Sequence, residues 1–128
     1  MGKSKENLKK RKITGGRKRA MRSRRAYEKN SYPIETVVGE SQNKVRMVRG
    51  GNIKIGAKSA LFVNVADPSS KKVTKLKIES VTSNSASRDY ERRRIITKGA
   101  ILQTELGSVK VTSKPGRDGE INGLLQNK

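Results

Sequence analysis

The stretch LFVNVADPSSKKVTKLKIE, residues 61–79, decides the fold of this chain. Residues 61–66 are apolar with one exception, as in a strand that is buried on both faces. The DPSS segment at 67–70 then supplies the side chains that favour a turn. After it, Leu76 and Ile78 alternate with charged residues, which is the period-two pattern of a half-buried strand. The stretch therefore predicts two strands joined by a turn.

The same alternation recurs before and after this stretch. It extends over residues 34–38 and again over 45–48. Further along, one short run ends at Thr104 and another begins at Val109, with Gly107 between them. Each of these runs predicts a further short strand.

Turn residues separate the strands, with GGN at 50–52 and KPGRDG at 114–119 forming two of the loops. Short strands punctuated in this way predict a mainly β fold, built as a small antiparallel β-barrel. Gly56 interrupts the strand that follows the GGN turn, so we expect that strand to bend or end there.

One stretch departs from the strand pattern. Asn84, Ser85 or Ser87 can cap a helix that runs to about Arg93. Asp89 lies one helical turn before Arg93, a spacing that favours an ion pair on a helix surface. We therefore expect one short helix between strands.

Positive charge dominates the composition. The 128 residues include 31 Lys and Arg against 11 Asp and Glu, a formal net charge of +20. A charge of this size repels itself in a compact state, so it calls for a polyanion such as a phosphate backbone. A membrane surface would need an apolar helical face or a lipid anchor beside the charge, and the sequence offers neither.

The charge is distributed unevenly along the chain. Residues 1–32 hold 13 Lys and Arg against 2 Glu, a net of +11, and their apolar residues are too sparse to form a core. We interpret 1–32 as a basic arm that is disordered when free and ordered on RNA, with 18–29 becoming helical once its charges are neutralised. Residues 33–125 would form the barrel domain, and 126–128 a frayed tail.

Several functions are excluded by what the sequence lacks. Without Cys there is no disulfide, thiolate nucleophile or cysteine zinc site, and without His the commonest metal ligand is missing. The carboxylates are scattered, and no glycine-rich stretch has the spacing of a P-loop. We therefore expect no catalytic residues, metal, cofactor or small-molecule substrate. No apolar run approaches 18 residues and no secretory signal is visible, so we expect an intracellular chain without a spanning helix.

The arm carries the strongest candidates for RNA binding. Guanidinium groups can hold phosphate oxygens bidentately, and the glycines of a flexible hinge at 14–16 let backbone N–H groups approach phosphates closely. The bland alternative is a solvated tail or a nuclear localisation signal. The candidate residues are Lys9, Lys10, Arg11, Lys12, Thr14, Gly15, Gly16, Arg17, Lys18, Arg19, Arg22, Arg24 and Arg25.

Three further basic segments lie in the barrel domain. For the GGN hairpin and for the last loop, an ordinary solvated hairpin or turn is an equally good interpretation. Tyr90 can stack on a base, although packing on the core is the better interpretation. The first segment is the GGN hairpin, the second the helix and its exit, and the third the last loop. Their candidates are Arg46, Arg49, Gly50, Gly51, Asn52 and Lys54, then Arg88, Arg92, Arg93, Arg94 and Lys98, then Lys114 and Arg117.

Five short sequence motifs occur along the chain in the same order as in a known protein family. Together they closely resemble the eighth small-subunit ribosomal protein of the eukaryotic and archaeal type, over nearly the whole chain. Because the long insertion typical of eukaryotic members is missing, the chain resembles an archaeal member. The motifs are TGGRKR at 14–19, VRGGN at 48–52, NVADP at 64–68, IITKGAILQTELG at 95–107 and VTSKPGRDG at 111–119.

The resemblance implies a β-rich, barrel-like domain with a basic extension that reaches into small-subunit ribosomal RNA. It also implies a structural role in a cytoplasmic small subunit, with that RNA and neighbouring small-subunit proteins as partners, and it implies no catalytic residues or cofactor. Two alternatives remain at this point. A DNA-compacting protein would share the charge, and an RNA-modifying enzyme would need an acid–base pair that the sequence does not offer.

Overall fold

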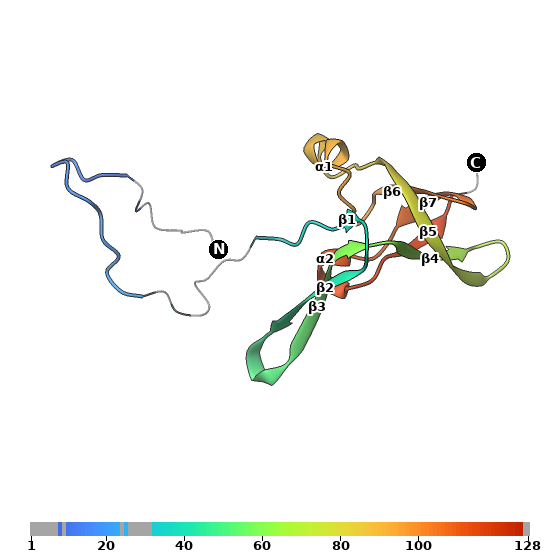
Figure 1. The fold of residues 1–128 in the computed structure, drawn as a ribbon, viewed down its shortest axis with the longest axis horizontal. Helices are drawn as coiled ribbons and strands as arrows, with labels where there is room; N and C mark the ends of the chain where they lie inside the picture. Colours follow the sequence, from blue (N-terminus) through green and yellow to red (C-terminus); the bar gives the residue numbers. More distant parts are fainter. Residues whose placement is uncertain (1–7, 9, 24, 26–31, 127–128) are drawn as a thin grey trace. The chain divides into compact units, whose positions relative to one another are not determined.

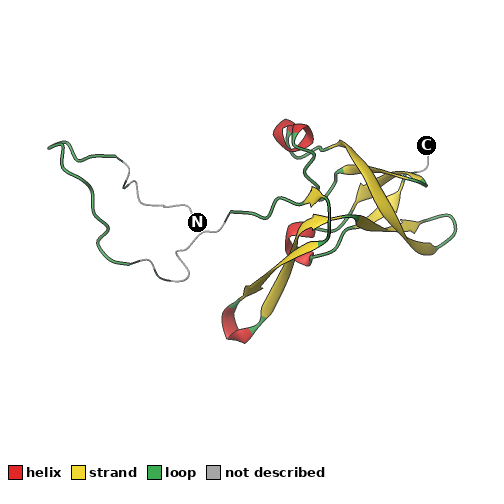
Figure 2. Ribbon diagram, in the orientation of Figure 1, coloured by secondary structure: helices red, strands yellow, loops and turns green. Residues whose placement is uncertain are grey.

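The computed structural model of the chain describes residues 8, 10–23, 25 and 32–126. The chain divides into two compact units, residues 1–33 and 34–128, and each is described by itself. The described part of the first unit holds no helix and no extended strand. The second unit holds the strands and helices, which Figures 1 and 2 trace along the chain.

The first unit contains a closed turn around the TGG sequence. Arg11 and Arg17 face each other in an isolated antiparallel bridge. The Lys12 N–H donates to the Gly16 carbonyl over 2.9 Å, and the Gly15 N–H donates to the Lys12 carbonyl over 3.0 Å. Gly15 has φ +78°, a conformation that glycine adopts without steric cost and that reverses the chain. Hydrogen bonds thus close the segment at 14–16 into a turn, and the expected flexibility of this hinge remains a prediction.

The helix expected on RNA spans residues that are only partly described. Residues 18–23 and 25 are not helical in the free chain. Residues 24 and 26–29 lie outside the described part, as do the candidate residues Lys9 and Arg24. The helix on RNA remains a prediction.

Within residues 32–126, five strands close into a barrel in the order β4-β5-β6-β7-β8. Neighbouring strands are antiparallel, except that β8 pairs with β4 in parallel. Five strands that alternate in direction leave the first and the last pointing the same way, so the closing pair must be parallel. The mainly β fold and the barrel are confirmed. The strands are β4 (Phe62–Asp67), β5 (Lys72–Ser83), β6 (Ile101–Thr104), β7 (Gly107–Val111) and β8 (Asn122–Leu125).

The barrel encloses a core of aliphatic side chains from all of its walls. Val63 and Val65 of β4 are each 1% exposed, and Leu102 of β6 is fully buried. Phe62, by contrast, is 46% exposed, so the expectation that residues 61–66 are buried on both faces is wrong. Side chains alternate between the two faces of a strand, so only alternate residues of β4 reach the core and the others stay at least partly exposed. The buried cluster comprises Ala60, Val63, Val65, Ile78, Val81, Ile96, Ala100, Leu102, Val109, Val111 and Ile121.

A three-stranded sheet precedes the barrel, with the order β1-β3-β2. It consists of β1 (Val37–Val38), β2 (Gln42–Met47) and β3 (Ile53–Ala60), and the one-turn helix η2 (Arg49–Gly51) joins β2 to β3. The run at 34–38 thus yields a strand of only two residues. β3 runs through Gly56 without ending there, so of the two predicted alternatives the strand end is wrong and the bend remains a prediction.

The β2–β3 hairpin is more exposed than its alternating sequence predicts. Val45 pairs with Ile55 and Met47 pairs with Ile53, so these four side chains share one face. All four are exposed, from 44% at Ile55 to 82% at Met47. The prediction of a half-buried strand at 45–48 is wrong, because no described element covers this face of the hairpin.

Helix α1 (Arg88–Arg92) confirms the predicted helix. Ser87 is its N-cap, and its hydroxyl oxygen accepts from the Asp89 N–H over 3.2 Å. A further helix, α2 (Pro115–Asp118), occupies the segment that was expected to be a plain loop. Pro115 has the φ that a first helical turn requires, and Gly119 at φ +81° ends the turn in the left-handed conformation.

The chain end returns to the barrel. The Gln126 N–H donates to the Ser108 carbonyl over 2.9 Å. Residues 127 and 128 lie outside the described residues, so the predicted fraying of this tail remains a prediction.

Candidate nucleic-acid interface

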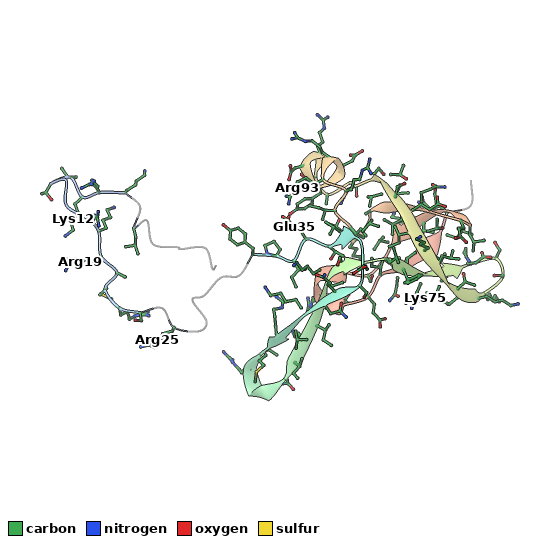
Figure 3. The ribbon with its side chains drawn as sticks, in the orientation of Figure 1. Lys12, Arg19, Arg25, Glu35, Lys75 and Arg93 are labelled. Atoms are coloured by element: carbon green, nitrogen blue, oxygen red, sulfur yellow. The ribbon has the colours of Figure 1, made fainter. Side chains whose placement is uncertain are left out.

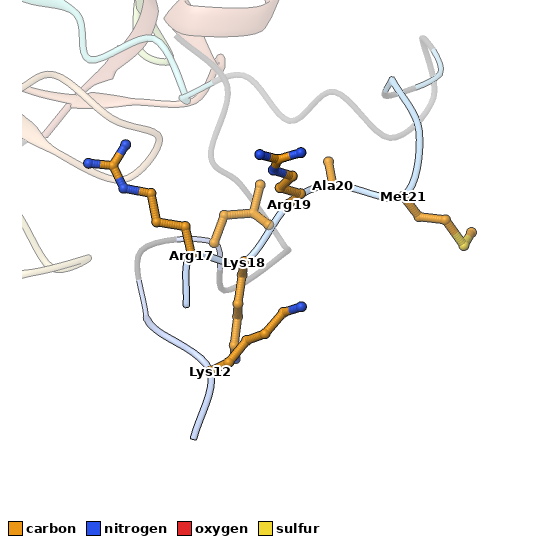
Figure 4. A pocket seen from close by; sticks show the side chains of 7 residues that line it. Lys12, Arg17, Lys18, Arg19, Ala20 and Met21 are labelled. Atoms are coloured by element: carbon orange, nitrogen blue, oxygen red, sulfur yellow. The ribbon is translucent and has the colours of Figure 1, made fainter. Parts of the chain in front are cut away.

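The turn of the first unit gathers cationic side chains around an open hollow of about 750 Å³. Figure 4 shows Lys12, Arg17, Lys18 and Arg19 around it. No Asp or Glu occurs between residues 8 and 25, so no nearby carboxylate in the sequence neutralises these groups. The turn therefore presents several cations close together on an exposed segment.

Hydrogen bonds to backbone carbonyls orient two arginines of this unit. The Arg11 guanidinium donates to the Gly15 carbonyl over 2.9 Å, across the turn. The Arg22 guanidinium donates to the Ser23 carbonyl over 3.2 Å. A guanidinium has five N–H donors, so the single bond of Arg11 leaves donors for phosphate oxygens. Lys10, Thr14 and the rest of 10–23 are exposed as well.

The tip of the β2–β3 hairpin is a tight turn with an exposed cation on each side. Gly50 and Gly51 both have positive φ, at +75° and +73°. The Asn52 side-chain amide donates to the Arg49 carbonyl over 3.1 Å and closes the tip. Arg49, Asn52 and Lys54 are all exposed, although the Asn52 amide is engaged in the bond that closes the turn. The tip therefore offers two cations and a backbone that needs glycine.

Arg46 differs from these tip residues because it is half-buried. Its guanidinium lies 3.4 Å from the Gly116 carbonyl, a weak bond that links the hairpin to α2. Its Nε is buried and has no partner among the described residues. This contact brings the hairpin and the 114–119 segment together, although they are far apart in the sequence. Lys114 and Arg117 beside it are exposed.

The arginines of α1 are divided between local ion pairs and solvent. The Arg93 guanidinium pairs with the Glu35 carboxylate, both labelled in Figure 3. It also lies 3.3 Å from the Asp89 carboxylate. These bonds raise the pKa of Arg93, the one to Glu35 contributing most. Arg88, Arg92 and Arg94 are exposed. Figure 1 places α1 and the hairpin tip at opposite ends of the second unit, so the predicted basic residues do not form one patch.

A buried asparagine holds the segment that follows α1. The Asn84 amide donates to the Ile95 carbonyl over 2.8 Å, and its oxygen accepts from the Ala86 N–H and the Thr97 hydroxyl. Asn84 was one of three candidate caps for the helix, but it fixes this loop while Ser87 caps. Lys98, which lies in the same segment, is exposed.

The outer face of β4 and β5 carries residues that were not among the candidates. Phe62 pairs with Lys77 and Asn64 pairs with Lys75, so all four point to the same side. The period-two pattern, with Phe62 and Asn64 in one strand and Lys75 and Lys77 in the next, could have revealed this face. It was missed because residues 61–66 were taken to be buried on both sides.

Two negative findings concern the described residues alone. No group of three or more His, Cys, Asp or Glu gathers among them as metal ligands would. In the same part of the chain, no helix is both long enough and apolar enough to cross a membrane.

A small β-barrel whose cations are spread over exposed turns is an arrangement typical of proteins that bind polyanions. The family model described as Ribosomal protein S8e matches residues 5–126. The chain belongs to this family, which confirms the resemblance noted in the sequence. Membership makes it a structural constituent of the ribosome and not an enzyme.

Curated relatives agree with this membership. The small ribosomal subunit protein eS8 of Sulfolobus acidocaldarius is 51% identical over 116 residues, covering 90% of this chain and 91% of the relative. The protein of the same name from Sulfurisphaera tokodaii is 50% identical over 117 residues, with 90% and 91% covered. That of Methanocorpusculum labreanum is 45% identical over 115 residues, with 90% and 92% covered.

Proposed function

We propose that the chain binds small-subunit ribosomal RNA through Lys and Arg contacts to phosphates and so stabilises the assembled subunit. The observation that carries the proposal is the cationic turn at residues 11–17, set in a stretch without any carboxylate. The relatives are named as proteins of the small ribosomal subunit, which supports this proposal. In it, the chain acts in the small subunit of the cytoplasmic ribosome, with neighbouring small-subunit proteins as further partners.

The arm, residues 1–32, supplies most of the binding free energy in this proposal. It holds a net charge of +11 in a quarter of the chain. Each phosphate that a cation neutralises releases condensed counterions, so affinity falls with salt by a log–log slope of about −0.7 to −0.9 per contact. The arm orders on RNA, and the contacts must offset the entropy that ordering costs.

The barrel domain, residues 33–125, fixes the register of the chain on the RNA by shape and by fewer phosphate contacts. Arg49 and Lys54 at the hairpin tip are candidates there, since both are exposed. Arg46 and Arg93 are partly committed to contacts within the protein. Arg88, Arg92, Arg94, Lys98, Lys114 and Arg117 complete the set, all of them exposed.

Sedimentation of a cell lysate through a sucrose gradient tests the proposal. At low salt the chain should travel in the small-subunit peak, and washing with rising salt should release it progressively. Its absence from that peak at low salt would contradict the proposal. A DNA-compacting function rests on the charge alone, and family membership counts against it.

A further inference from the structure

Phe62, the single phenylalanine of the chain, lies on the outer face of the barrel. The residue is 46% exposed at the start of β4. Single exposed aromatic residues are common on protein surfaces, so the residues around Phe62 decide whether it can bind a ligand.

Lys75 is positioned above the Phe62 ring. Its Nζ lies 4.9 Å from the ring centroid, within the range of a cation–π contact. Figure 3 shows Lys75 on the β4–β5 side of the barrel. Lys77, the cross-strand partner of Phe62, adds a second cation to the same face. A flexible lysine over the ring can move aside, which a packed core residue could not do.

A hollow of about 400 Å³ opens beside the ring. This size falls in the range of small-ligand sites, about 300–1,000 Å³. Polar groups line it together with Phe62: Ser41, Asn43, Asn64, Lys75 and Glu120. The side-chain amide of Asn64 donates to the Asn122 Oδ1 over 2.9 Å, which fixes its orientation. The hollow thus combines an aromatic face, one oriented amide and a lysine.

We propose that this hollow binds one unpaired nucleotide of RNA, with its base stacked on Phe62 and its phosphate held by Lys75. The inference deepens the proposed RNA-binding function and rests on it. Unpaired bases are recognised by stacking on aromatic side chains and by hydrogen bonds to their edges. Asn43 and Asn64 supply donors and acceptors of the kind that read a base edge.

The composition of the hollow favours a base over a bare phosphate and over a protein segment. The Glu120 carboxylate would repel a phosphate placed deep inside, whereas it can accept from the amino group of a base. An acidic peptide would leave the ring without a stacking partner. Double-stranded RNA keeps its bases stacked inside the helix, so it cannot fill the site.

Binding of single-stranded octauridylate to the full chain tests the inference, with an abasic oligonucleotide of the same length as the second probe. Phe62→Ala should weaken octauridylate binding by about 5- to 150-fold, the range for losing one stacked base. Binding of the abasic probe should not change. Phe62→Trp should restore affinity, because it restores a stacking face. Leu106→Ala removes another exposed apolar side chain, 55% exposed in the β6–β7 turn, and should bind like wild type.

The outcomes separate this inference from the proposed function. Equal octauridylate affinity of Phe62→Ala and wild type, or an equal loss on both probes, would overturn the nucleotide site. If wild type binds both probes while Phe62→Ala has no effect, only the site fails. If wild type binds neither probe at low salt, the proposed function fails with it. An unchanged amide NMR spectrum outside β4 and β5 establishes that Phe62→Ala remains folded.

Ultraviolet crosslinking in intact small subunits gives an independent measurement. A base stacked on Phe62 should yield a crosslinked peptide from residues 61–66, identified by mass spectrometry. Crosslinks confined to other peptides, with none at 61–66 in subunits that contain the chain, would overturn the site.

Discussion

Gly56 and Gly116 lie in direct backbone contact: a Cβ built on Gly56 would stand 2.3 Å from the Gly116 carbonyl oxygen. Gly56 belongs to β3 and Gly116 to α2, so this pair marks the point at which α2 lies against the three-stranded sheet. Gly116 in turn approaches the Ile34 carbonyl, 2.7 Å from its own hypothetical Cβ. Three segments of the chain meet where neither glycine leaves room for a side chain.

Gly56→Ala should therefore destabilise the barrel domain. The added methyl group meets backbone atoms, which cannot swing away, and overpacking of this kind costs about 1–3 kcal/mol. Gly39→Ala is the matched control, because its Cβ would meet only Ser59 at an ordinary 3.8 Å. The control should leave the free energy of unfolding unchanged or raise it by up to about 1 kcal/mol. Urea unfolding measures both, and equal midpoints for the two variants would refute the contact.

The exposed face of the hairpin and the barrel core should respond differently to truncation. Leu102 is fully buried, so Leu102→Ala should cost about 2–5 kcal/mol. Met47 is 82% exposed, so Met47→Ala should change the free energy of unfolding by no more than about 0.5 kcal/mol. Thermal unfolding followed by circular dichroism compares them. A large loss at Met47 would mean that something covers the hairpin in the isolated chain.

Asp67 should titrate below its ordinary value of 3.8. The Ser69 N–H donates to its carboxylate over 2.9 Å and the Ser70 hydroxyl over 2.8 Å, and these bonds lower the pKa of Asp67. A lowered folded-state pKa contributes stability that is present above 3.8 and is lost as pH falls through the folded value. The Ser69 amide shift, followed by NMR against pH, should move with a midpoint below 3.8. A midpoint at or above that value would contradict the turn geometry.

The arm should dominate the salt dependence of RNA binding. Replacing Arg17, Lys18 and Arg19 by Gln should reduce the log–log slope by about 2–3, since each cation accounts for about 0.7–0.9. Gln at Lys58, Lys71 and Lys72 removes the same charge from exposed positions of the barrel domain and is the control. Fluorescence anisotropy with labelled ribosomal RNA across a salt series measures the slopes. Equal slopes for the two triple variants would show that total charge, and not the arm, governs binding.

The strand-rich fold was predictable because period-two patterns and turn residues are local properties of the sequence. Ile78 is buried, as the alternation in its strand predicts, and Ser87 caps α1, as one of the three predicted caps. The burial of the strand at 45–48 was predicted wrongly, because apolar alternation at Val45 and Met47 does not reveal whether another layer covers the strand. The α2 turn was missed because Pro115 and Gly119, which start and end it, are also the residues of a plain loop, and the close approach of Gly116 to Gly56 is long-range.

The candidate interface was predictable only as a set of cations. Charge density identifies the arm, but it cannot tell that the turn at 14–16 is closed by hydrogen bonds. Nor does it reveal that Arg93 pairs with Glu35, a residue 58 positions away in the sequence. The Phe62 face needed the register between β4 and β5, which only the folded barrel provides.

Competition between small-subunit ribosomal RNA and duplex DNA of equal phosphate content, at rising salt, tests the central claim most directly. Counterion release weakens both complexes, so only contacts beyond bulk charge can separate them. We predict that the full chain retains a preference for the ribosomal RNA at near-physiological salt, with a log–log slope that reflects several phosphate contacts. Equal affinity for the DNA, or binding to the RNA that does not change with salt, would contradict the account.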